Sequence, residues 1–293
     1  PFWFGARDCP LEIWIPQLGK VAVPAYEAAL YDGIQLAKSG VTTVVHCHNI
    51  SDVQRIKEEL LDTVRGYTDA GIRVVLCPPY TDQNALIYGE RSQFMASLDG
   101  KQRDEFSNMV TDAPLSLSAY LKLVEELKEG MKDLIHEEMA AIQLHPVGGQ
   151  WCSDEALAEI KAYAQKNRMR IHMHLLETKY QKIYGQKNWG KSIVAHFEEI
   201  GFLGPWLTIA HAVWLTEEDR KILKRNQVKV VTNPSSNLRL RSGIFSLQEM
   251  VQSGITCAIG LDGCALDDDQ DYGRELRLAL YNPAVSGIQA QVT

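Results

Sequence analysis

Seven short runs rich in β-branched residues recur along the chain, and helical patterns separate most of them. Strand-like runs that alternate with helices in this way are typical of repeated βα units and a parallel sheet. The runs that we expect to form strands are 41–47, 72–77, 139–145, 169–174, 207–211, 228–232 and 255–260. The repeat therefore indicates an α/β fold.

The helices between these strands carry their own start and stop signals. Ser51, Ser153 and Thr216 each stand just before a helical pattern, where a hydroxyl can accept a hydrogen bond from the first turn. Glycines follow several of the patterns, at the position where a left-handed residue ends a helix. They are Gly40, Gly71, Gly201 and Gly254.

A further helical pattern, over 24–39, comes before the first predicted strand. Because a βα repeat begins with a strand, one more strand ahead of this helix would make eight, the closure number of a (β/α)8 barrel. No linker rich in Pro, Gly and Ser divides the chain, so we expect one TIM-like barrel domain over 1–293, with strands 2 to 8 present. The stretch 78–115 is expected to form a large irregular loop over the active-site end.

Polar residues gather at the ends of the predicted strands, which is where a parallel barrel places its chemistry. Imidazole and carboxylate groups of this kind are the ligands that zinc accepts, so the pattern predicts a metal-assisted hydrolase. The strand-end residues are His46, His48, Cys77, His145, Gln150, Trp151, His172, His174, Glu177, His211, Asn233 and Asp262.

His174 and Glu177 form the sharpest pair, because an imidazole can hold a metal while a carboxylate three residues later moves protons at the same site. The alternative is a histidine bonded to a loop, with Glu177 merely opening a helix. His211 and Asp262 each end a strand of buried pattern, where an unpaired ionisable group is costly. Either alone could be a satisfied core group, but with His174 they resemble a zinc ligand set.

The bulk properties narrow the class of partner. A net charge of −7 argues against nucleic acid and anionic membranes and favours a small organic substrate. No apolar run approaches the roughly 20 residues of a spanning helix, and the first ten residues lack the features of a signal peptide. The six cysteines form no CxxC pair, which predicts free thiols in a reducing, cytoplasmic compartment.

Five segments, in order, resemble strand-end motifs of the amidohydrolase superfamily. They are "GVTTVVHCHN", "RIHMHLLET", "TIAHAVWLTEED", "VVTNPSSNLRLRSG" and "AIGLDGCALDDDQDYGRELRLA". The resemblance covers about 36–282, and it is closest to the branch of cytosine and guanine deaminases, S-adenosylhomocysteine-type deaminases and triazine hydrolases. It implies a (β/α)8 barrel that holds one divalent metal, with zinc favoured and iron as the alternative.

The resemblance also implies roles for single residues. His174 and Asp262 match metal ligands, Glu177 matches the acid that moves protons, and His211 matches a histidine beside the metal that orients water or substrate. Catalysis would then rest on Glu177, His211 and Asp262, and the metal on His174, Asp262 and His211. Asn233, Ser236 and Asn237 match the family's strand-7 signature, which mainly shapes a loop. Gln150 and Trp151 are implied more weakly, as residues of the substrate pocket.

The chain departs from the family at His46 and His48. The family carries a His-x-His ligand pair on strand 1, whereas "VVHCHN" follows a segment that resembles the approach to strand 2. We therefore expect this pair to line the barrel or to support the site, and a substitute ligand role is the less favoured alternative. The β-sandwich that flanks the family's barrel has no match either, which suggests a piece of a longer enzyme.

Three functions remain open from the sequence. The resemblance favours deamination of an amino-substituted N-heterocycle by metal-activated water. The same site could instead dechlorinate a triazine or open a cyclic amide, because pocket shape alone separates these reactions. In the third, the chain is a catalytically silent barrel that acts as a scaffold. We expect a homodimer in each case.

Overall fold

The computed structural model describes residues 7–17, 23–83, 88–89, 91–109 and 115–282. Each of the seven predicted runs contains a strand. The strands are β1 (Thr43–Cys47), β2 (Arg73–Cys77), β4 (Ala140–Ile142), β6 (Ile171–Leu175), β7 (Leu207–His211), β8 (Lys229–Thr232) and β9 (Cys257–Ile259), with two short ones, β3 (Pro79–Tyr80) and β5 (His145–Pro146).

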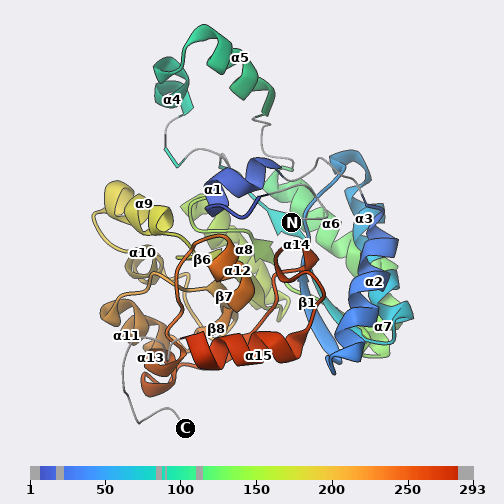
Figure 1. The fold of residues 1–293 in the computed structure, drawn as a ribbon. Helices are drawn as coiled ribbons and strands as arrows, with labels where there is room; N and C mark the ends of the chain where they lie inside the picture. The colour runs from blue at the N-terminus through green and yellow to red at the C-terminus, as the bar shows by residue number, and fades with distance from the viewer. Residues whose placement is uncertain (1–6, 18–22, 84–87, 90, 110–114, 283–293) are drawn as a thin grey trace.

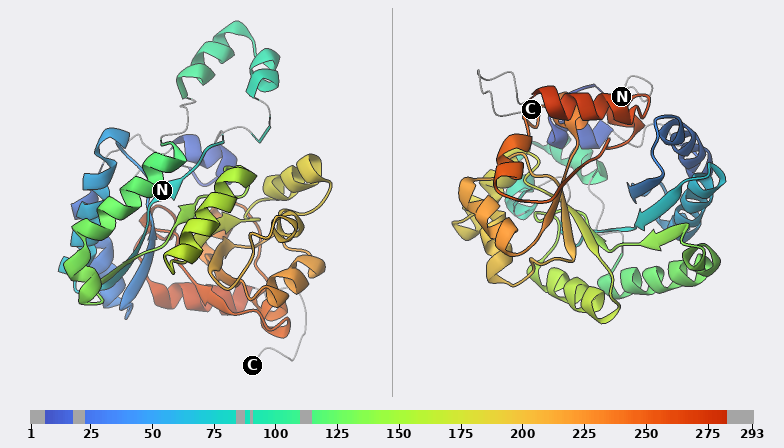
Figure 2. Two further views of the ribbon diagram at one scale, coloured as in Figure 1. Left: turned by 180° about the vertical axis from the view of Figure 1, so that it is seen from behind. Right: turned by 90° about the horizontal axis from the view of Figure 1, so that it is seen from below.

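All strand pairs are parallel, as the βα repeat predicts. One sheet has the order β1-β2-β4 and another the order β6-β7-β8-β9, and single bridges from Leu144 to Ile171 and from Gly148 to His174 connect them. Among the described residues no strand pairs with the outer edge of β1 or of β9. The structure is therefore an open (β/α) barrel with one gap in its wall (Figure 2, right).

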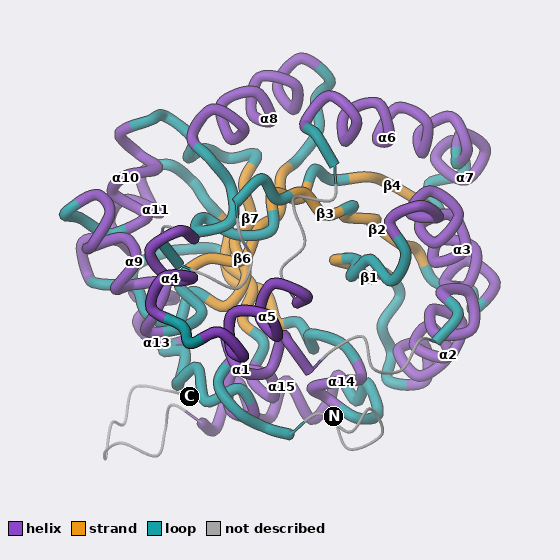
Figure 3. The backbone as a smooth tube through the Cα atoms, turned by 90° about the horizontal axis from the view of Figure 1, so that it is seen from above, coloured by secondary structure: helices purple, strands orange, loops and turns teal. Residues whose placement is uncertain are grey.

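Helices surround the strands, as Figure 3 shows from above. The longer ones are α2 (Ala25–Lys38), α3 (Ile56–Asp69), α6 (Leu117–Gly130), α8 (Asp154–Lys166), α9 (Lys179–Trp189), α11 (Glu217–Arg225) and α15 (Tyr272–Tyr281). The shorter ones are α1 (Leu11–Trp14), α7 (Lys132–His136), α10 (Ile193–Glu199), α12 (Pro234–Arg239), α13 (Leu247–Gln252) and α14 (Cys264–Asp267). No helix in the described ranges combines the length and the apolarity needed to cross a membrane.

Two of the three predicted helix caps are confirmed. Ser153 accepts a hydrogen bond from the amide of Ala156, and Thr216 forms a reciprocal capping box with Asp219. The prediction for Ser51 is wrong. Asp52 caps a 3₁₀ turn (Val53–Arg55) through the amide of Gln54, and α3 begins only after that turn. The prediction for the four glycines is confirmed, since each adopts a positive φ after its helix.

The prediction of an irregular stretch over 78–115 is also wrong. Its described part contains two helices, α4 (Arg91–Ser97) and α5 (Gly100–Met109), which stand away from the barrel in Figure 1. The rings of Phe94 and Phe106 pack 4.7 Å apart between them, and the Asp99 carboxylate caps the second helix through the amide of Gln102. These contacts lie within the segment, so the helices form without burial against the barrel.

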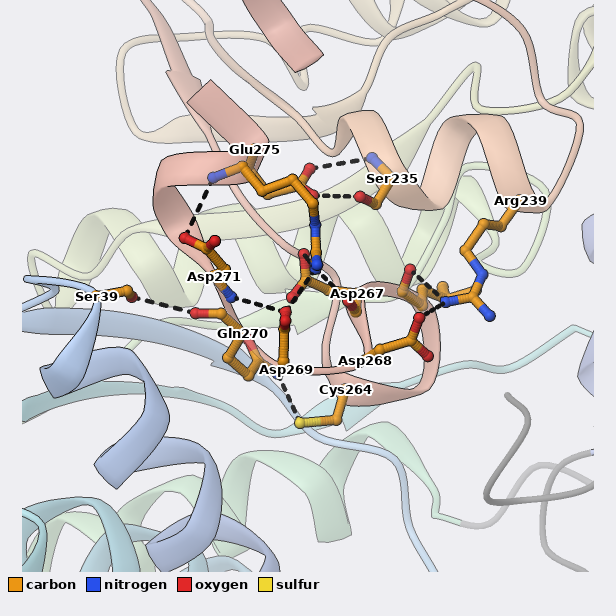
Figure 4. A network of polar contacts seen from close by, with 12 residues as sticks. Ser39, Ser235, Arg239, Cys264, Asp267, Asp268, Asp269, Gln270, Asp271 and Glu275 are labelled. Carbon is orange, nitrogen blue, oxygen red and sulfur yellow. Dashed lines mark hydrogen bonds and ion pairs between the residues drawn. The ribbon is translucent and has the colours of Figure 1, made fainter. Parts of the chain in front are cut away.

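Contacts across the gap in the wall join α2 to the segment that follows β9. The Ser39 hydroxyl donates to the Gln270 carbonyl at 3.1 Å, within the network of Figure 4. The Cys264 thiol donates to the Asp32 carboxylate at 2.7 Å. Polar contacts between α2 and the α14 region therefore hold the two sides together where no strand pairs them.

Candidate metal centre

The barrel brings together four residues that the sequence singles out. His174 lies near the end of β6, Glu177 follows it, His211 ends β7, and Asp262 follows β9. Donor atoms of His174, His211 and Asp262 lie within 4.8 Å of one another. His211 Nε2 is 3.7 Å from Glu177 Oε2 and 3.9 Å from Asp262 Oδ2. Residues separated by up to 88 positions thus share one site at the strand ends.

Neighbouring groups hold these side chains in place. His174 Nδ1 donates to the Val147 carbonyl at 2.7 Å, which leaves its Nε2 with a free lone pair. His211 Nδ1 lies 3.0 Å from Asn237 Oδ1, and the Ser236 hydroxyl donates to Asp262 Oδ2 at 2.6 Å. Both partners belong to α12, which follows β8. The "NPSSN" segment therefore orients functional side chains as well as shaping its loop.

Burial and charge push the pKa values of the site in different directions. Burial raises the pKa of Glu177 to about 7, and the Asp262 carboxylate adds to that effect. Burial lowers the pKa of His174 to about 4. Burial also disfavours the charged form of His211, but the carboxylates of Glu177 and Asp262 outweigh it, and the net pKa is raised. An acid with a pKa near neutrality, beside a histidine that is protonated more readily than usual, suits proton transfer.

The backbone at the strand ends is strained. Leu176, His211 and Asp262 have φ values of 51°, 71° and 64°, in the left-handed region that costs a non-glycine residue about 1 kcal/mol or more. Three such residues at the ends of three strands of one sheet, β6, β7 and β9, are consistent with a functional site, where surrounding structure holds strained residues in place.

The donor set fits a divalent metal. Two imidazoles and one carboxylate are ligands that zinc accepts, and the Asp262 side chain is about one-quarter exposed, so a cation can reach it. Glu177 Oε1 is buried and has no hydrogen-bond partner in the described part of the chain, so this oxygen is available to contact a bound ligand.

His46 and His48 lie outside both groups of potential metal ligands that the described residues form. His46 Nδ1 is 3.0 Å from the hydroxyl of Tyr67 on α3, and His46 Nε2 is 3.3 Å from His48 Nδ1. His48 Nε2 is 3.5 Å from Glu59, also on α3. The pair therefore packs between β1 and α3, and burial lowers the pKa of His46 to about 3.

Cys47, between these two histidines, belongs to a second donor group. Its sulfur lies within 4.8 Å of ligand atoms of His145 and His174. A hydrogen bond with Cys77 holds the pKa of the Cys47 thiol well below its usual range, and the His172 and His145 rings add to that effect. From the sequence, Cys47 was expected only to be one of several scattered thiols. Its place one residue from each histidine, at the end of a strand, was the available signal.

Gln150 and Trp151 are both buried, with exposed fractions of 1% and 5%. Trp151 packs with Leu11 and Trp14 of α1, so the N-terminal segment lies over the strand ends. From that segment, Glu12 Oε1 accepts a hydrogen bond from the Thr178 hydroxyl at 2.5 Å, next to Glu177 in sequence. Glu12 could not be predicted as part of the site, because no local sequence pattern marks it.

Comparison with known proteins supports the resemblance seen in the sequence. The model of the amidohydrolase family matches residues 4–289. A 5'-deoxyadenosine deaminase of Methanothermobacter thermautotrophicus is 31% identical over 280 residues, which cover 94% of this chain and 57% of that protein. Across curated relatives the chain spans 30 to 57% of their length.

Solved structures also share the fold, and two of them are zinc-bound enzymes. An adenosine deaminase from Xanthomonas campestris with bound zinc superposes with a TM-score of 0.74, at 21% identity, over 95% of this chain and 56% of that one. An atrazine chlorohydrolase from Arthrobacter aurescens in complex with zinc gives a TM-score of 0.68, at 21% identity, over 89% of this chain and 55% of that one. At this identity the likeness establishes the (β/α) barrel fold alone.

Proposed function

Because the chain belongs to the amidohydrolase family, we propose that it carries a metal-dependent site that deaminates an amino-substituted N-heterocycle. The observation that supports this most directly is Glu177, a buried acid with a pKa of about 7 that lies 3.7 Å from His211 and beside the candidate metal ligands. The deaminase names of the sequence relatives point to an adenosine-type nucleoside as the substrate.

His174, Asp262 and His211 would hold the metal, which we propose is zinc. When bound, a divalent metal lowers the pKa of a water and so supplies a nucleophile at neutral pH. The site residues do the rest. Glu177 takes one proton from the water and delivers it to a ring nitrogen, and then takes the second proton from the added hydroxyl group and delivers it to the amino group, which leaves as ammonia. A carboxyl with a pKa near 7 can both accept and donate in this way. His211 would hold the metal only in its neutral form; in its charged form, which the carboxylates of Glu177 and Asp262 favour, it would instead stabilise the negative charge that develops.

Gln150 and Trp151 would line the substrate pocket on the side of α1. We further propose that residues 1–293 form one domain, that the protein works in the cytoplasm as a homodimer, and that its partner is a small heterocycle. Free thiols at all six cysteines agree with a reducing compartment.

The experiment that tests this function is ammonia release by the zinc-loaded chain from a panel of aminopurine nucleosides, with Glu177→Gln as the variant. We expect the variant to lose about 10²- to 10⁴-fold in rate, the usual contribution of a positioned acid or base. Glu155→Gln is the matched control, because Glu155 is exposed in the first turn of α8.

Undiminished activity in Glu177→Gln would disprove the assigned role. Chloride release from a chlorotriazine without ammonia release from any nucleoside would favour dechlorination, and hydrolysis of a cyclic amide would favour ring opening. A purified chain that binds no zinc and turns over none of these compounds would support the silent scaffold instead.

A further inference from the structure

We propose that Cys47, His145 and His174 form a second binding site, the cysteine site, for a thiophilic divalent cation such as zinc. A cation would bind there as an alternative to the set of His174, His211 and Asp262. Cys47 ends β1, His145 begins the two-residue β5, and His174 lies one residue before the end of β6; their ligand atoms lie within 4.8 Å of one another. A thiolate with two imidazoles is a donor set that zinc accepts in proteins.

Hydrogen bonds hold both histidines of the cysteine site in the tautomer that metal binding requires, with the proton on Nδ1. His145 Nδ1 donates to the carbonyl of His172 at 2.8 Å, and His174 Nδ1 donates to the carbonyl of Val147 at 2.7 Å. A carbonyl can only accept, so each Nδ1 carries the proton and each Nε2 keeps its lone pair. Histidines that ligate metals in proteins are usually held in this way by their second nitrogen.

The position of Cys47 lets a cation reach it. Successive side chains of a strand point to opposite faces, so Cys47 points away from its neighbours His46 and His48, which face α3. Cys47 is partly exposed at the open edge of the barrel, while His145 is only 1% exposed. Binding replaces the thiol proton with the cation, so one proton is released for each ion bound.

The two sites cannot be occupied by cations at the same time, because His174 belongs to both and has only one free nitrogen. A cation that prefers sulfur will favour Cys47 and His145, and one that prefers oxygen will favour Asp262. A cation bound at the cysteine site leaves the set of His174, His211 and Asp262 without a metal. Excess thiophilic metal should therefore inhibit the proposed deamination, in which Glu177 acts on the water at that set. The inference rests on the proposed function only for this expected inhibition.

Binding of cobalt(II) in place of zinc tests the cysteine site, because a cobalt–thiolate bond gives a charge-transfer band in the near ultraviolet. One equivalent added to the whole chain should produce this band, and Cys47→Ser and His145→Gln should each abolish it. Cys257→Ser is the matched control, since Cys257 is a partly exposed cysteine on β9, on the other side of the gap, and should leave the band unchanged. Asp262→Asn should also retain it.

A wild-type chain that binds cobalt without the band, or a band that survives Cys47→Ser, overturns the proposal. If Cys47→Ser fails to fold, judged by circular dichroism, alkylation of the wild-type chain decides instead. Zinc should protect Cys47 but not Cys257 from iodoacetamide, and equal labelling with and without zinc overturns the proposal. Cobalt bound without a thiolate band would leave the proposed deaminase site intact, so the two failures are distinguishable.

Discussion

Glu177, His174 and His211 show how burial assigns different roles to neighbouring ionisable groups. Burial raises the pKa of Glu177 to about 7 and lowers that of His174 to about 4, whereas two carboxylates raise that of His211. At neutral pH His174 is therefore a neutral imidazole that could bind a metal, His211 is protonated more readily than an ordinary histidine, and Glu177 can exchange its proton. This division of roles is what hydrolytic deamination requires.

The Ser236 hydroxyl should matter for metal binding although it ligates nothing itself. It donates to Asp262 Oδ2 at 2.6 Å and so fixes the carboxylate toward His211. We expect Ser236→Ala to weaken zinc binding about 10- to 100-fold, the usual effect of losing a group that orients a ligand. Competition with a chromophoric chelator measures the dissociation constant.

The control for this variant is Ser253→Ala, because the Ser253 hydroxyl bonds only within α13, at the Glu249 carbonyl. An unchanged zinc affinity in Ser236→Ala would show that Asp262 is oriented without the serine or does not bind the metal.

Among the elements, α15 is attached to α12 by a buried carboxyl group. Glu275 is fully buried and accepts hydrogen bonds from the amide of Ser235, at 3.0 Å, and from its hydroxyl (Figure 4). Burial raises the pKa of Glu275 to about 7, and a hydrogen bond with Asp267 adds to the rise. The folded chain therefore holds a proton there that the unfolded chain releases.

This difference makes stability depend on pH. The contribution of Glu275 to the free energy of unfolding is complete below its ordinary pKa of 4.5 and is lost as the pH rises through about 7. We expect Glu275→Gln, which cannot ionise, to remove on the order of 2 kcal/mol of the loss in stability that the metal-free wild type shows between pH 5 and pH 8. Urea unfolding at both pH values measures it.

Glu177 titrates in the same direction, so the comparison must be made between variants rather than from the wild type alone. Glu137→Gln, at an exposed position after α7, should keep the wild-type difference between the two pH values. The same difference in Glu275→Gln would mean that Glu275 does not titrate in this range.

At the scale of the whole molecule, the open wall leaves two strand edges without partners among the described residues. Such edges expose backbone donors and acceptors that a second chain can pair with. Val45 on β1 is also 46% exposed, which is high for an apolar residue in a barrel strand. The edge at β1 is therefore a candidate surface for the homodimer that we propose.

A charge on that edge should weaken the association, since charged residues on edge strands oppose strand pairing. We expect light scattering to give a dimer for the wild type and a shift toward monomer for Val45→Lys. Val53→Lys is the control, because Val53 is 43% exposed but lies in a 3₁₀ turn outside the strands. A dimer that Val45→Lys leaves intact would place the interface elsewhere, and a monomeric wild type would contradict the homodimer itself.

The order of the seven strands, their parallel pairing and the residue types at their ends could be predicted from the sequence. β-branched runs and helix caps are local signals, and they do not depend on what the segment later contacts. His174, Glu177, His211 and Asp262 were found for the same reason, since the carboxyl ends of parallel strands meet at one end of a barrel. The helices α4 and α5 were missed because the segment's turn-rich start concealed their short helical patterns.

The sequence already favoured His174 over His46 and His48 as a metal ligand, but only the tertiary structure showed that this second pair faces a helix and does not line the barrel. His46 and His48 face α3, and the cysteine between them faces His145 and His174. The sequence motif alone cannot show which side chains point into the barrel, because that depends on how the strand packs against its sheet and helices. Glu12 reaches Thr178 across 166 positions for a related reason: α1 packs on Trp151, and no local pattern encodes that long-range contact.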